Sequence, residues 1–118
     1  IGCEQDSLSA VTREAISFMR RNVASRITVS DIASHLYLSP SHLSHVFKDE
    51  TGVSLMDYMT AIRIEESKHL LTDAHLSITD VAMALGFNDS SYFSRCFKKQ
   101  EGISPSEYRQ RMITAGKS

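Results

Sequence analysis

The feature that most constrains this sequence is an internal repeat with a period of about fifty residues. When residues 41–58 are aligned with residues 91–108, seven of the eighteen pairs are identical, whereas chance would give about one or two. Three more pairs match further upstream, at an offset of 49 residues rather than 50: Asp31/Asp80, Ala33/Ala82 and Leu36/Leu85. The two copies are therefore expected to fold alike, with one extra residue in the second copy near Asn88 and Asp89.

Composition restricts the classes of protein that remain. A chain of 118 residues with 42% apolar content is enough for one compact unit or two very small ones. The formal net charge of -1 and a pI near 6.6 lack the basic balance typical of nucleic-acid binders, so any DNA-binding surface must arise from local arrangement.

Nothing in the sequence indicates a membrane protein or an exported one. No apolar run reaches the roughly 20 residues that a membrane span needs, and no signal-peptide pattern is present. The two cysteines, Cys3 and Cys96, form neither a disulfide framework nor a zinc pattern. We therefore expect a cytoplasmic protein, and we interpret the start at Ile1 as a piece of a longer chain.

Helical periodicity and capping residues predict an all-α chain of about seven helices. Apolar residues at helical spacing predict an opening helix at about 9–23. Each copy then begins with a hydroxyl residue and, three positions later, an acid: Thr28-x-x-Asp31 and Ser77-x-x-Asp80. This is the pattern of a capping box, in which two side chains satisfy free amides at a helix start. A short helix is therefore expected at the start of each copy.

The turn after each short helix differs between the copies in one residue. Gly86 stands in the second copy where a helix end needs left-handed backbone. Tyr37 stands at the same place in the first copy, where a side chain is strained in that conformation. We therefore expect the first turn to be built differently from the second.

The second helix of each copy has one apolar face and one polar face. Capping residues precede it, Ser39 before Pro40 in the first copy and Asp89 in the second. At about 100° per residue, the apolar residues share a face: Leu43, Val46 and Phe47, and Phe93, Cys96 and Phe97. The opposite faces carry small hydroxyls beside a basic or hydrogen-bonding side chain: Ser41, Ser44, His45 and Lys48, and Ser91, Ser94, Arg95 and Lys98.

A long helix is expected between the copies, from just after Ser54 to about Leu71. Its roughly 17 residues span about 25 Å, so it acts as a rigid strut. A final helix runs from Pro105 to about Ile113. We divide the chain into a disordered leader (1–8), a first helix-turn-helix subdomain (9–54), a linker helix (55–72), a second helix-turn-helix subdomain (73–113) and a frayed tail (114–118).

A short helix, a tight turn and a second helix with a polar face form a helix-turn-helix, whose second helix fits a major groove about 12 Å wide. Two copies joined by a stiff helix are more specific than one, because successive major grooves on one face of DNA recur every ~34 Å. The sequence therefore predicts a monomeric domain that reads two adjacent grooves of double-stranded DNA.

Several stretches together form a family signature. In the second copy these are residues 78–82, 85–87, 91–99 and 102–109; in the first copy and the linker they are residues 43–48, 50–52, 63–64 and 70–71. They resemble the AraC/XylS family of bacterial transcription regulators over about residues 10–112. The resemblance implies an all-α domain that binds promoter DNA, usually to activate transcription, without a cofactor. It also implies a separate sensing or dimerisation domain, a dimeric full-length protein and a contact with RNA polymerase.

The resemblance places the DNA-reading residues on the two polar faces. Carried over by position, the base-reading residues are Ser41, Ser44 and His45, and Ser90, Ser91, Tyr92 and Arg95. The positions near the phosphates are Lys48, Lys98 and Lys99. Tyr92 is equally consistent with packing and with DNA contact. The serines are also typical of a solvent-exposed face with no binding role. His45 stands where an arginine is common, which argues against a bidentate guanine contact there.

Other interpretations account for fewer residues. Arg20, Arg21 and Arg26 complement the dipole of the opening helix, and they are secondary candidates for phosphate contact. His42 and His45 have a spacing that a metal can share, but no third ligand accompanies them. A helical protein-interaction module would suit the near-neutral charge. A serine–histidine hydrolase would need a G-x-S-x-G elbow, which is absent, so we predict that the chain is not an enzyme.

Overall fold

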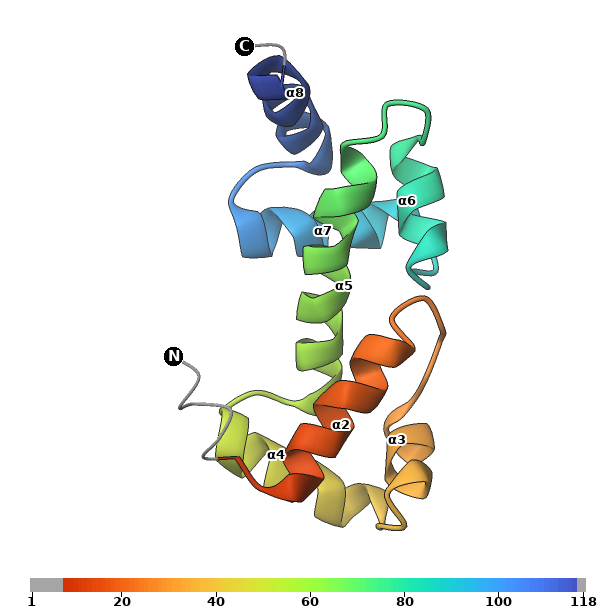
Figure 1. Ribbon diagram of the computed structural model, residues 1–118, viewed down its shortest axis with the longest axis vertical. Coiled ribbons are helices and arrows are strands. Elements are labelled where there is room, and N and C mark those ends of the chain that lie inside the picture. The colour runs from red at the N-terminus through yellow and green to blue at the C-terminus, as the bar shows by residue number, and fades with distance from the viewer. Residues whose placement is uncertain (1–7, 117–118) are drawn as a thin grey trace. The chain divides into compact units, whose positions relative to one another are not determined.

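The computed structural model describes residues 8–116, and these form seven helices and no strand (Figure 1). The helices are α2 (Ala10–Arg21), α3 (Val29–His35), α4 (Pro40–Thr51), α5 (Leu55–Leu71), α6 (Ile78–Ala84), α7 (Ser90–Glu101) and α8 (Pro105–Gly116). The all-α prediction is confirmed. Helix α8 extends to Gly116, past the predicted end at Ile113, and residues 117–118 of the predicted tail lie outside the described residues. The predicted leader, apart from Leu8, lies outside the described residues.

The chain divides into two compact units, each of which contains one copy of the repeat. Among the described residues, unit 1 comprises 8–22 and 26–59, and unit 2 comprises 23–25 and 60–116. The division falls inside α5, after Met59. Unit 1 therefore holds α2, α3, α4 and the start of α5, and unit 2 holds the rest of α5 with α6, α7 and α8.

The capping residues predicted from the sequence begin the helices of both units. The hydroxyl of each capping box accepts a hydrogen bond from the amide of its acid, and the acid accepts one in return: Thr28 and Asp31 (3.2 and 2.8 Å), and Ser77 and Asp80 (2.9 and 3.0 Å). Ser39 and Asp89 accept from the third amide along, at 3.1 and 2.7 Å. Such caps contribute about 0.5–2 kcal/mol each.

The turn between the two helices of each unit has the same hydrogen bonds in both units, so the prediction of a different first turn is wrong. The bonds are Tyr37 N–H to Ser34 O (3.2 Å) and Leu38 N–H to Ala33 O (2.9 Å), matched by Gly86 N–H to Met83 O (3.1 Å) and Phe87 N–H to Ala82 O (3.0 Å). These bonds determine the backbone, so Tyr37 takes a φ of 58° where Gly86 takes 83°. Left-handed backbone costs a residue with a side chain about 1–2 kcal/mol. The extra residue of the second copy is Asn88, which lies between this turn and the cap of α7.

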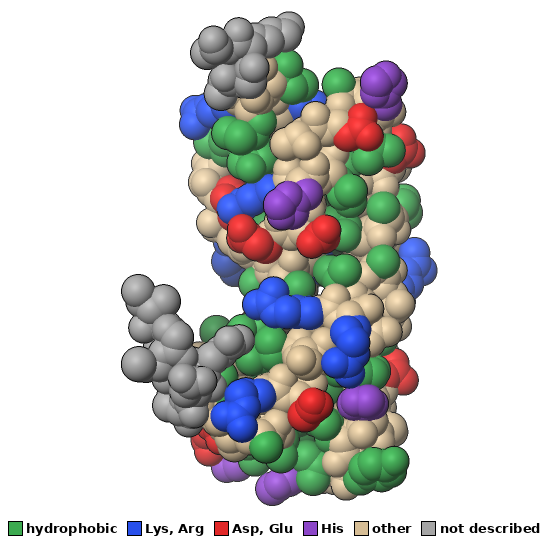
Figure 2. Space-filling view, viewed as in Figure 1, with side chains coloured by type: hydrophobic (Ala, Val, Ile, Leu, Met, Phe, Trp, Pro, Cys, Tyr) green, Lys and Arg blue, Asp and Glu red, His purple; other side chains and the backbone are tan. Residues whose placement is uncertain are grey.

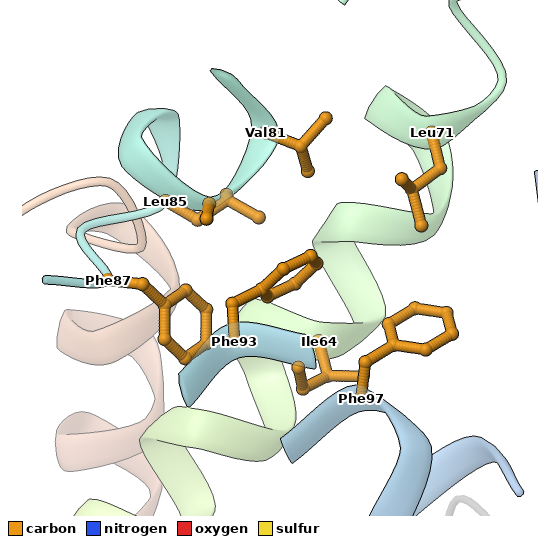
Figure 3. Close-up of a cluster of buried hydrophobic side chains, with 8 residues drawn as sticks. Ile64, Leu71, Val81, Leu85, Phe87, Phe93 and Phe97 are labelled. Carbon is orange, nitrogen blue, oxygen red and sulfur yellow. The ribbon is translucent and has the colours of Figure 1, made fainter. Parts of the chain in front are cut away.

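Unit 2 is built around a cluster of buried apolar side chains. Figure 3 shows its larger members, which come from α5, α6, α7 and the turn between the last two: Ile64, Leu71, Val81, Leu85, Phe87, Phe93 and Phe97. Ring centroids of successive phenylalanines lie 5.1 and 5.9 Å apart. Such aromatic pairs add about 0.5–1.5 kcal/mol beyond their buried area.

Unit 1 repeats the main aromatic contact of unit 2. Phe47 of α4 is fully buried, and its ring meets the edge of Tyr58 on α5 at 5.3 Å. Phe97 of α7 makes the matching contact with Tyr108 on α8 at 5.5 Å. The repeated residues Phe and Tyr therefore serve the cores, as their type and spacing predict.

A carboxylate holds the start of α2 in unit 1. Glu50 accepts hydrogen bonds from the amide and the hydroxyl of Ser9, both at 3.0 Å. The hydroxyl of Thr12 and then the Ser9 amide lower the pKa of Glu50 below its ordinary value of 4.5, because both donate to the charged form.

A buried arginine holds the short segment 23–25 in unit 2. Arg63 of α5 is 8% exposed, and it donates to the carbonyls of Ser25 (2.6 Å) and Val23 (3.3 Å). Burial lowers the pKa of its guanidinium. A Cβ on Gly86 would lie 3.4 Å from the carbonyls of Ala24 and Ser25, an ordinary contact distance. The segment therefore packs closely beside the turn of this unit.

Replacing Gly86 with alanine is expected to lower the free energy of unfolding by about 1–2 kcal/mol, because alanine is strained at positive φ. Gly102→Ala is the matched control, since Gly102 has a φ of 86° with nothing within 4 Å of the added Cβ. We expect the two losses to agree in chemical denaturation. A much larger loss at Gly86 would show that position 86 requires glycine because of its contact with segment 23–25 and not because of backbone strain.

The stabilisation from Glu50 is expected to depend on pH. Because its folded-state pKa lies below 4.5, its contribution is fully present above that value and is lost as the pH falls through the folded-state pKa. Glu50→Gln should therefore reduce stability near neutral pH and approach the unmodified chain in acid. Denaturation midpoints of both proteins across this pH range measure the effect. If the difference between the two denaturation midpoints stayed constant at all pH values, the charge of Glu50 would not contribute to stability.

Candidate nucleic-acid interface

Helices α4 and α7 present equivalent surfaces. Residues 41–50 and 91–100 follow the same order of exposed, half-buried and buried positions, without exception. The buried positions are Leu43 and Phe47, and Phe93 and Phe97. Because the helix repeats about every 3.6 residues, burying these side chains turns the opposite face outward.

The structure places most of the predicted site residues on these outward faces. Most are exposed: Ser41, His45, Lys48, Ser91, Tyr92, Arg95, Lys98 and Lys99. Ser44 and Ser90 are half-buried. Each unit therefore brings its own predicted set together on one helix.

The outward face of α7 is cationic. The charged side chains of the whole helix are Arg95, Lys98, Lys99 and, at its last position, Glu101. The guanidinium carbon of Arg95 lies 5.8 Å from the centre of the Tyr92 ring, a cation–π contact. In the described part of the chain, none of the three cations is ion-paired with a carboxylate. They are free to meet an external anion.

The structure gives Tyr92 a double role that the sequence left open. Its ring lies 6.1 Å from that of Phe87 and also contacts Arg95, yet the residue is 47% exposed. Tyr92 therefore packs on the core with one side and supports Arg95 with the other.

Helix α4 has a different balance of charge. It holds one lysine, Lys48, against the two carboxylates of Asp49 and Glu50, of which Glu50 is hydrogen-bonded to Ser9 at the start of α2. His45 Nε2 lies 3.2 Å from Asp49 Oδ2, and both side chains are well exposed. Asp49 therefore engages a ring nitrogen of His45, the residue at the position where the family resemblance leads us to expect an arginine. Figure 2 shows basic and acidic side chains interspersed over the visible face, without one broad basic patch.

Two contacts hold the C-terminal end of α7 against α5. Lys68 Nζ lies 2.9 Å from Glu101 Oε1, and both side chains are mostly covered. The hydrogen bond with Glu101 is the largest influence that raises the pKa of Lys68. Gln100 donates to the carbonyl of Ala61 at 3.4 Å. Because Glu101 is paired with Lys68, it offsets the free cations of α7 less than the count of charges suggests.

Four arginines outside α4 and α7 differ in exposure and in role. Arg20, Arg21 and Arg26 are exposed, and the first two lie in the last turn of α2, as predicted. Arg109 has a structural role that the sequence did not indicate, because it donates to the carbonyl of Leu71, the last residue of α5 (2.9 Å), and to that of Asp73 just beyond it (3.2 Å). A cation at a helix C-terminus satisfies carbonyls that lack partners within the helix.

Residues 8–116 contain neither a metal-binding cluster nor a membrane-spanning helix. No three His, Cys, Asp or Glu side chains come together there in a metal-binding arrangement. None of the helices combines the length and the apolar character that crossing a bilayer would take.

Comparisons with known proteins agree with the geometry. Residues 32–111 match the family model described as a helix-turn-helix domain. The arabinose operon regulatory protein of Escherichia coli strain K12 is 41% identical over 98 residues, which cover 82% of this chain and 34% of that protein. The chain spans about a third of the length of such curated relatives.

Solved structures show the same fold. The C-terminal domain of AraT, a response regulator from Geobacillus stearothermophilus, has a TM-score of 0.81 and 35% identity, and the match covers 89% of this chain and 88% of that one. A transcriptional regulator with an AraC-type DNA-binding domain from Chromobacterium violaceum has a TM-score of 0.81 and 27% identity, with 86% and 91% covered. The chain therefore belongs to the AraC/XylS family of transcription regulators and is a helix-turn-helix DNA-binding domain of that family.

Proposed function

We propose that α4 and α7 each enter a major groove of promoter DNA and read two successive grooves of one duplex. The observation that carries this proposal is the matched outward faces of the two helices, of which the face on α7 holds three cations that pair with no carboxylate among residues 8–116. Recognition helices of helix-turn-helix domains contact base edges through such a face.

The residues divide by chemistry into base readers and phosphate contacts. The proposed base readers are Ser41, Ser44, His45, Ser90, Ser91, Tyr92 and Arg95, and the proposed phosphate contacts are Lys48, Lys98 and Lys99. Arg95 has the planar fork that pairs with guanine O6 and N7, and its contact with Tyr92 limits where it points. The serines are short, so they let the backbone approach the bases.

The two helices are proposed to contribute unequally. Because phosphate contacts supply most of the salt-dependent affinity, the cations of α7 provide more of it than the mixed charges of α4. His45, held by Asp49, offers one hydrogen bond rather than two. Unit 2 therefore dominates affinity, while unit 1 adds weaker selection at a second groove.

The proposal extends to the whole protein, of which this chain represents about a third by comparison with curated relatives. We propose that the full-length protein is a cytoplasmic activator that contacts RNA polymerase and dimerises through another domain, whereas this domain alone is a monomer. We assign it no enzymatic activity and no cofactor, since base and phosphate recognition need neither.

The competing function is a helical protein-interaction module, which the net charge of -1 favours. Salt dependence separates the two. Duplex binding that weakens steeply with added salt supports DNA recognition, because neutralised phosphates release counterions. Failure to bind a randomised pool of duplexes at low salt would leave the interaction module as the better explanation.

Arg95→Ala and Lys98→Ala are expected to differ in kind. Loss of Arg95 should cost about 1–3 kcal/mol on a duplex selected by the protein and relax the preference at one base pair, whereas loss of Lys98 should weaken all sequences alike and reduce the salt slope by about one. Fluorescence anisotropy with selected and scrambled duplexes measures both. The assignment of Arg95 as a reader fails if Arg95→Ala keeps its affinity and its preference.

Asp49→Asn is expected to strengthen binding to every duplex by about two- to fivefold at low salt, because it removes an exposed negative charge from the side of α4 that faces phosphates. The gain should shrink as salt is added. Glu66→Gln is the matched control, since Glu66 is an exposed acid on α5. Equal gains for both variants in the anisotropy titration would mean that only net charge matters, and not the place of Asp49.

A further inference from the structure

Tyr37 is strained and exposed at the same time. It is the one residue other than glycine with a positive φ among residues 8–116, and it is 94% exposed. The corresponding position in unit 2 is Gly86, which has no side chain to strain. The same turn therefore exists in this chain with and without a tyrosine.

The fold of unit 1 does not explain the tyrosine. The described residues provide no hydrogen bond, ion pair or ring contact for its side chain, and only its backbone N–H is bonded, to Ser34 O. Exposure to this degree means that burial does not offset the strain. Strained residues that packing does not explain are found at functional sites more often than elsewhere.

The position of Tyr37 indicates which partner the side chain meets. It lies in the turn of the helix-turn-helix, two residues before Ser39, which caps α4. In a bound helix-turn-helix the first helix crosses the DNA backbone while the second enters the groove, so the turn between them borders a phosphate strand. A phenol hydroxyl is a neutral donor to phosphate oxygen.

We propose that Tyr37 is a phosphate-contacting residue, whose hydroxyl donates to the DNA strand that borders the groove entered by α4. This inference rests on the proposed function. It gives unit 1 an uncharged contact with phosphate. Helix α4 of this unit has more acids than lysines, so it supplies few charged contacts of its own. Unit 2 lacks this contact, since glycine occupies the position.

The test uses this 118-residue chain, its Tyr37→Phe and Tyr37→Gly variants, and a labelled pool of randomised duplexes. Tyr37→Phe should weaken binding by about tenfold or more by removing one hydrogen bond to a charged acceptor. The dependence of affinity on salt should keep its slope, because no charge is lost. Tyr37→Gly should bind at least as weakly, while its denaturation midpoint does not fall.

Tyr108→Phe is the control for this exchange, since Tyr108 packs on Phe97 in the core of unit 2 and its variant should bind normally. Normal binding by both Tyr37 variants would overturn the inference and leave the proposed function intact. No duplex binding by the unmodified chain at low salt would refute the proposed function itself. A loss of affinity that tracked a loss of stability would also overturn the inference, because a purely structural residue behaves in that way.

Discussion

Burial of Phe47 and Phe97 is the constraint on which the rest of each unit depends. Each ring is covered completely and meets a tyrosine edge from the following helix. With that ring inside, the helical period leaves only one face of α4 or α7 for solvent. A register shift of one residue would bury a polar side chain and expose an apolar one, so the same packing that stabilises the unit selects the residues available to DNA.

The cores are more alike than the surfaces they support. Caps, turn hydrogen bonds and exposure patterns recur in both units, while the charges of the two helices differ: α4 holds one lysine and α7 holds three cations. Packing restricts the buried positions to a few apolar types, because interiors are dense. The outward positions face water and have no such restriction, so a partner is free to determine them. This difference is the physical reason to look for function where the two copies disagree.

Much of the fold was predictable because its signals are local. Capping boxes, Gly102 and the apolar stripe of α7 each specify structure within one helical turn. The turn at Tyr37 was mispredicted because residue preference is weaker than the hydrogen bonds that close the turn. Arg63 and Arg109 look in the sequence like ordinary surface cations, and only their distant carbonyl partners reveal their roles. The candidate readers were found through helical phase and family position, whereas the support that Tyr92 gives Arg95 required coordinates.

The identical exposure order of residues 41–50 and 91–100 has a consequence for how such a domain changes over time. The outward positions of either helix contribute little to its core, so they are free to vary without loss of folding. If the outward residues read DNA as proposed, a new pair of them changes the preferred DNA sequence of that unit alone. Two copies of one small scaffold would then supply two halves of a recognition site that vary independently, without the symmetry that a dimer of identical subunits would impose on its DNA.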